Sequence, residues 1–127
     1  MSEIDNSPST HVSVYEPIYV RISIEEGISM PKRCLCSIGE TLHVMENGSV
    51  RPCAFADINL GNVKKSSLGE IWENTVNSQW LIKLRNPQEL SGACSTCSYS
   101  HVCIGCRVRA KVATGSWFSS DPMCALA

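Results

Sequence analysis

The sequence predicts a small, irregular α+β domain that is stabilised by a bound metal or metal cluster. Three observations predict this class. The chain has only 127 residues, so it is long enough for one domain with a thin hydrophobic core. Its strand-like and helix-like segments are short and amount to a β-hairpin and two helices. Its eight cysteines stand in cysteine-rich loops at intervals typical of metal ligands, and metal sites supplement the core in domains of this size.

The N-terminal region divides into a tail and a lead-in segment. Residues 1–11 are rich in Ser, Pro, Asn and Asp, with almost nothing apolar to bury, so we expect a disordered tail. From Val12 to Ile24 apolar residues stand at every second position, except across Glu16-Pro17. This alternation predicts an extended strand that is interrupted at the proline. Residues 12–33 would then lead into the main domain, residues 34–127.

A β-hairpin is predicted next. The β-forming segments Thr41–Met45 and Val50–Cys53 flank Asn47-Gly48, and this dipeptide is a strong signal for a hairpin turn. A hairpin brings its two ends together. We therefore expect Cys34 and Cys36, which precede the hairpin, to converge with Cys53 at its open end.

Two helices follow in the second half of the chain. Ser67 and Glu70 form a capping box, apolar residues then recur at intervals of three and four, and Asn86-Pro87 ends the helix. Residues 54–63, which precede this helix, predict an irregular loop. A second helix is predicted to begin near Cys106 and to end at Gly115.

The cysteines carry the functional information. Four of them form the block Cys94-x2-Cys97-x5-Cys103-x2-Cys106, and Cys124 follows Asp121-Pro122. Thiolates at such short intervals can surround a metal or an iron-sulfur cluster with little chain between them. All eight cysteines are therefore candidate ligands of a metal or cofactor: Cys34, Cys36, Cys53, Cys94, Cys97, Cys103, Cys106 and Cys124.

Three kinds of cysteine chemistry compete. Four disulfides are disfavoured, because the N-terminus lacks a signal peptide and the chain is therefore predicted to be cytoplasmic, where thiols stay reduced. Zinc sites of the ribbon type separate their cysteine pairs by about 15 to 20 residues, whereas only five residues separate Cys97 from Cys103. The crowding favours iron-sulfur clusters, and zinc stays as the alternative.

Other function classes have little support. The net charge is −1 without a polybasic run, so neither nucleic acid nor a membrane surface is an expected partner. The apolar stretches are too short to cross a bilayer. His11, His43 and His101 are isolated in the sequence, and only His101, near Cys103, is an expected neighbour of a metal site. No catalytic residue is predicted.

The order of these motifs resembles the SPASM domain, which stands at the C-terminal end of many radical SAM enzymes. The resemblance runs from Cys34 to Cys124 and includes more than cysteines. Its elements are Gly48-x4-Cys53 with Pro52, Gly61-Asn62-Val63, the helix start Ser67-Leu68-Gly69-Glu70-Ile71-Trp72, Gly105-Cys106-Arg107, and Asp121-Pro122-Met123-Cys124.

This resemblance implies two auxiliary [4Fe-4S] clusters that serve electron transfer and help to position a substrate, expected to be a peptide. By the family pattern Cys36, Cys53 and Cys106 hold the first cluster, with Cys34 the candidate for its remaining ligand. The second cluster has the ligands Cys94, Cys97, Cys103 and Cys124.

The sequence has no Cys-x3-Cys-x2-Cys motif for the cluster that would cleave S-adenosylmethionine, and it is too short for a barrel core as well. The expected partner is therefore a radical SAM catalytic domain or protein, and whether the chain is itself an enzyme stays open. Two alternatives remain: a stand-alone electron carrier or peptide-binding module, and a zinc-bound structural module.

Overall fold

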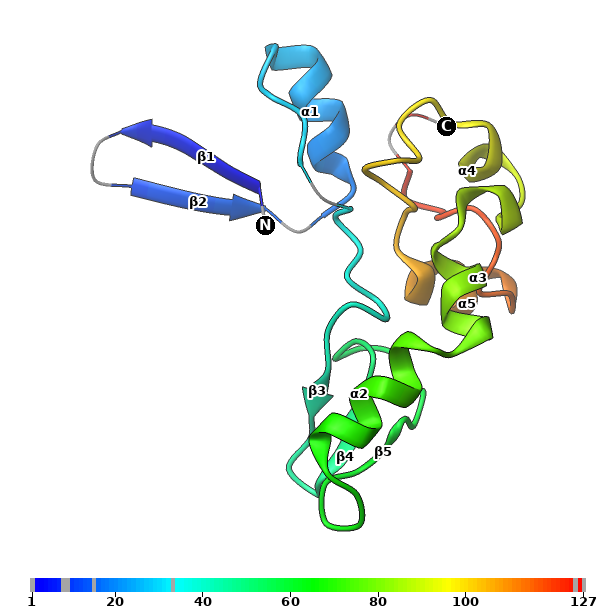
Figure 1. Cartoon of the computed structure of the whole chain (residues 1–127). Coiled ribbons are helices and arrows are strands. Elements are labelled where there is room, and N and C mark those ends of the chain that lie inside the picture. Colours follow the sequence, from blue (N-terminus) through cyan, green and yellow to red (C-terminus); the bar gives the residue numbers. More distant parts are fainter. Residues whose placement is uncertain (1, 8–9, 15, 33, 125, 127) are drawn as a thin grey trace. The chain divides into compact units, whose positions relative to one another are not determined.

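The computed structural model of the chain describes residues 2–7, 10–14, 16–32, 34–124 and 126 (Figure 1). The chain divides into two compact units, one formed by Met1–Cys36 with Pro87–Ala127 and the other by Ser37–Asn86. Short helices combine with a two-stranded and a three-stranded antiparallel sheet. The predicted α+β class is confirmed.

The first unit begins with a β-hairpin instead of the expected disordered tail. Strands β1 (Ser2–Ser7) and β2 (Thr10–Val14) pair in antiparallel fashion. The prediction of disorder considered only the lack of apolar side chains to bury. Main-chain hydrogen bonds hold a two-stranded ladder together, and they do not depend on side-chain polarity.

Helix α1 (Ile18–Glu26) replaces the second half of the predicted strand, which was wrong over this segment. The alternation of apolar residues was misleading, because Ile18 and Ile24 are 50% and 42% exposed. Tyr19, Val20 and Ser23 are the buried residues, and their spacing of three and four defines one face of a helix. Pro17 precedes the helix, where its missing N–H and fixed φ favour the first turn.

The hydrophobic cluster of the first unit holds the earliest cysteines in place. Tyr19, Val20, Leu35 and Val102 are its buried members, and the partly buried Cys103 packs against them. The Leu35 N–H donates a hydrogen bond to the Val102 carbonyl at 3.1 Å. The short segment of Cys34, Leu35 and Cys36 therefore lies directly beside the segment that carries Cys103.

The rest of the first unit consists of a 3-10 turn η1 (Pro87–Glu89) and the helices α4 (Ala93–Thr96) and α5 (Arg107–Thr114). The second predicted helix is confirmed as α5, with Cys106 at its N-cap and Gly115 in the left-handed conformation at its C-cap. After α5 the chain returns to the start of α4, where the Ser91 N–H donates to the Phe118 carbonyl at 2.8 Å.

The second unit contains the predicted hairpin, here strands β3 (His43–Val44) and β4 (Ser49–Arg51) (Figure 1). Gly48 has a φ of 85°, and its N–H donates to the Met45 carbonyl at 2.8 Å to close the turn. A third strand, β5 (Gly61–Asn62), pairs with β4. Part of the loop predicted over residues 54–63 is therefore a short edge strand.

Two helices stand where one was predicted, α2 (Leu68–Val76) and α3 (Gln79–Arg85). The capping box of Ser67 and Glu70 is confirmed, and hydrogen bonds from the backbone N–H and the hydroxyl of Ser67 lower the pKa of Glu70. The break falls at Asn77-Ser78, because the Ser78 hydroxyl accepts a hydrogen bond from the Leu81 N–H and caps a new helix. Trp72, in α2, is 38% exposed.

Within the described ranges, no helix has the length and apolar character that a membrane crossing requires.

Candidate metal centre

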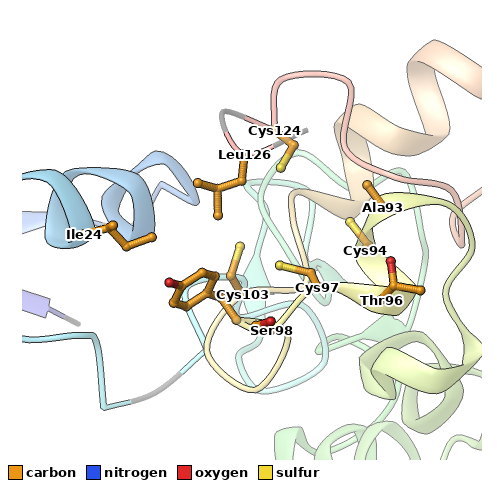
Figure 2. Close-up of a pocket in the computed structure, with 10 residues that line it drawn as sticks. Ile24, Ala93, Cys94, Thr96, Cys97, Ser98, Cys103, Cys124 and Leu126 are labelled. Atoms are coloured by element: carbon orange, nitrogen blue, oxygen red, sulfur yellow. The ribbon is translucent and has the colours of Figure 1, made fainter.

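Four thiols line one cavity of the first unit, those of Cys94, Cys97, Cys103 and Cys124. Figure 2 shows their sulfur atoms directed toward a common space. The cavity has a volume of about 470 Å³. It falls within the range of about 300–1,000 Å³ that is usual for small-molecule and cofactor sites.

Local structure explains how Cys94 and Cys97 come to face the same space. Cys94 lies in α4 and Cys97 is its C-cap residue, so they stand three positions apart on one helical turn. The Ser120 hydroxyl supports this turn by accepting a hydrogen bond from the Cys94 N–H at 3.3 Å and donating to the Ser91 carbonyl at 3.0 Å. The segment that leads to Cys124 is thereby tied to the start of α4.

The environment of Cys103 shows how closely the thiols are grouped. Burial, together with the neighbouring thiols of Cys34, Cys94 and Cys124, raises the pKa of Cys103 to about 11, against the lowering effect of a hydrogen bond from the Gly105 N–H at 3.4 Å. Such a group is expected to stay protonated until a cation binds, because a coordinated metal deprotonates a thiol outright. An amide directed at a ligand sulfur is also a feature of iron-sulfur sites.

Four thiols around one cavity are a donor set that suits an iron-sulfur cluster. All eight cysteines are free thiols in the structure. Among the described residues, no three Cys, His, Asp or Glu side chains are grouped as they would be around one metal ion. Ile24, Tyr99 and Leu126 add apolar surface around the cavity.

Arg107 is buried next to this cavity, at the start of α5. Its exposed fraction is 0%. One guanidinium nitrogen, Nη2, donates to the Cys94 sulfur at 3.7 Å, and the other, Nη1, donates to the carbonyls of Trp117 and Ser119 at 3.1 and 2.7 Å. The sequence places Arg107 next to Cys106 but could not show that its side chain reaches the sulfur of Cys94.

Asp121 connects two cysteine-bearing segments and had no predicted role beyond its place in a motif. Its carboxylate accepts hydrogen bonds from the N–H groups of Cys106 at 2.7 Å and Met123 at 3.0 Å. It also pairs with Arg109 at 2.7 Å. Burial alone would raise the pKa of Asp121, but these hydrogen bonds outweigh it and lower the pKa. The signal available in the sequence was an acidic residue three positions before Cys124.

The other predicted ligands are distributed over both units. Cys34, Cys36 and Cys106 belong to the first unit, and all three are partly buried. Cys53 belongs to the second unit, so its convergence with Cys34 and Cys36 stays a prediction. His101 is exposed and does not line the cavity.

Comparisons with known proteins agree with a metal-cluster site. The sequence model of the SPASM family, described as an iron-sulfur cluster-binding domain, matches residues 34–98. The AdoMet-dependent heme synthases of Methanosarcina barkeri and Oleidesulfovibrio alaskensis are 38% and 34% identical, over 86% and 76% of this chain. The pre-heme d1 synthase of Dinoroseobacter shibae is 35% identical over 62% of it.

The matched region is a minor part of each relative. The chain spans 30% and 24% of the two heme synthases and 20% of the pre-heme d1 synthase. No solved structure shows significant similarity to the chain.

Proposed function

Since the chain belongs to the SPASM family of iron-sulfur cluster-binding domains, we propose that Cys94, Cys97, Cys103 and Cys124 hold a [4Fe-4S] cluster. The observation that carries this proposal is the single cavity lined by all four thiols. They come from α4, from the turn before α5 and from the segment after it. Four cysteine thiolates are the usual ligand set of a cubane cluster, and these four are the set that the family resemblance implies.

We further propose a second [4Fe-4S] cluster with Cys36, Cys53 and Cys106 as ligands and Cys34 as the fourth. This part rests on the family pattern and on the total of eight cysteines. Two features of the first unit bear on it. Cys34 and Cys36 are held beside Val102 by the Leu35 hydrogen bond, and the N–H of Cys106 is held by Asp121.

SPASM domains are part of radical SAM enzymes, and we propose that this domain provides auxiliary electron transfer and substrate positioning to such an enzyme. The names of the relatives direct the proposal for the substrate. Because they are heme and pre-heme d1 synthases, a heme-type tetrapyrrole precursor replaces a peptide as our first choice. A peptide substrate is the alternative.

Metal and acid-labile sulfide analysis of protein purified without oxygen tests the cluster proposal directly. We expect about eight iron and eight sulfide per chain, which corresponds to two cubane clusters. About four iron and four sulfide per chain would support only the cluster proposed in the Cys94 cavity. About two zinc without sulfide would overturn the proposal and leave a structural zinc module.

A complementation assay tests the proposed role. The domain is added to a separately purified radical SAM catalytic domain of a heme synthase from which this region has been deleted. Restored turnover of the tetrapyrrole is the expected result, and domain that lacks its clusters serves as the control. Binding without turnover would contradict the auxiliary role and favour a stand-alone module.

A further inference from the structure

Arg107 is an unusual buried cation. None of its surface is exposed, and its Nε atom has no hydrogen-bond partner. Its guanidinium donates hydrogen bonds to two backbone carbonyls and to the sulfur of Cys94. Carbonyl dipoles stabilise a cation only in part, and a buried charge is unfavourable unless an opposite charge accompanies it.

None of the carboxylates in the described part of the chain forms an ion pair with Arg107. The basic partners of the ion pairs found there are Arg21, Arg51, Arg85 and Arg109. The acidic group that Arg107 contacts is instead the Cys94 thiol at 3.7 Å, one of the four that line the cavity. The cavity is therefore the place where a negative charge would compensate this cation.

The other basic side chains of α5 do not share this arrangement. Arg109 pairs with Asp121 and Glu16 at 2.7 and 2.8 Å. Lys111 is exposed and donates to the Gly115 carbonyl at 2.7 Å, at the end of the same helix. Arg107 alone combines full burial with a contact to a cavity thiol among the basic residues of this helix.

The backbone before α5 is shaped around the guanidinium. Gly105 has a φ of 66°, and a Cβ atom at this position would lie 2.9 Å from Nη2 of Arg107. The Nη2 atom that contacts Cys94 thus occupies space that the Cβ atom of any residue other than glycine would need at position 105. Arg107 is also attached to the carbonyls of Trp117 and Ser119, in the segment that leads toward Cys124.

We propose that Arg107 is the internal counter-cation of the cluster in this cavity and raises its reduction potential; the proposal rests on the function proposed above. Reduction transfers one electron from an external reductant to the cluster and adds one negative charge to it. A fixed positive charge in a medium of low dielectric constant stabilises that reduced form. Hydrogen bonds to cluster sulfurs act in the same direction.

The test is a redox titration with dithionite, monitored by electron paramagnetic resonance, on anaerobic protein whose iron and sulfide have been counted. Arg107→Gln keeps a hydrogen-bond donor but removes the charge, and Arg107→Lys keeps the charge. Lys111→Gln removes one charge from the exposed end of the same helix and is the matched control. We expect Arg107→Gln to shift the reduction potential of one cluster to more negative values. Arg107→Lys should keep the potential close to that of the wild type, and Lys111→Gln should leave the potential unchanged.

A fully loaded Arg107→Gln protein with the wild-type potential would overturn the proposal. If Arg107→Gln loses the cluster, Arg107→Lys decides between charge and packing. A cluster that is retained with lysine supports the need for a cation. Equal loss of the cluster in both variants would mean that Arg107 has only a structural role, which would contradict the proposal. Wild-type protein that contains no acid-labile sulfide would overturn the cluster proposal itself. The iron and sulfide count gives this result before any variant is compared.

Discussion

Replacement of Cys97 by serine is expected to remove one complete cluster, so that iron and sulfide each fall by about four per chain. Cys97 caps α4 and is one of the four thiols that line the cavity. A serine hydroxyl is a far poorer ligand for iron, and three thiolates leave one iron of the cubane cluster without a protein thiolate. Iron and sulfide analysis together with the electron paramagnetic resonance spectrum of the reduced protein measures the loss.

Ser98→Ala is the matched control for Cys97→Ser. Ser98 lies next to Cys97 and also lines the cavity, but it supplies no thiolate, so full iron content is expected. Unchanged iron in Cys97→Ser would remove this residue from the ligand set. Cys34→Ser, measured in parallel, addresses the proposed second cluster: loss of one cluster supports Cys34 as its fourth ligand, and full iron content excludes it.

Gly105→Ala is expected to destabilise the domain strongly and to impair cluster binding. The new Cβ would lie 2.7 Å from Cβ of Asp121 and 2.9 Å from Nη2 of Arg107. These side chains support Cys106 and Cys94. An alanine at a φ of 66° costs roughly 1–2 kcal/mol by itself, and forced overlap in a packed site adds about 1–3 kcal/mol. Thermal unfolding and iron content both measure the effect.

Gly115→Ala separates backbone strain from overlap. Gly115 ends α5 with a φ of 79°, and a Cβ there would meet nothing within 4 Å. This variant should show only the strain of roughly 1–2 kcal/mol and keep its full iron content. If the two alanine variants were equally stable and equally loaded with iron, close packing around Gly105 would have no role in shaping the site.

Structural features that depend only on residues close together in the sequence were predicted well. The Asn47-Gly48 turn, the Ser67–Glu70 capping box and the helix that begins after Cys106 are all present. Each of them is a pattern of a few consecutive residues whose hydrogen bonds close locally. The sequence also predicted a cysteine-rich metal site, and the thiols of Cys94, Cys97, Cys103 and Cys124 do line one cavity.

The errors occurred where burial decides between alternatives of similar local energy. Residues 18–24 alternate like a strand, yet they form α1, because packing against Leu35 and Val102 selects the face that carries Tyr19 and Val20. A short apolar segment is compatible with either structure until its packing partners are known. Strand β5 was missed for a related reason, since two residues gain strand structure only by pairing with β4.

The sequence by itself determined the chemistry of this protein: the number, type and spacing of its thiols are covalent properties of the chain. Only the tertiary structure decided the environment of those thiols. Asp121 reaches the amide of Cys106, fifteen positions away, and Arg107 reaches Cys94, thirteen positions away. No local pattern encodes such contacts, because they depend on how the segments around α4 and α5 pack against each other.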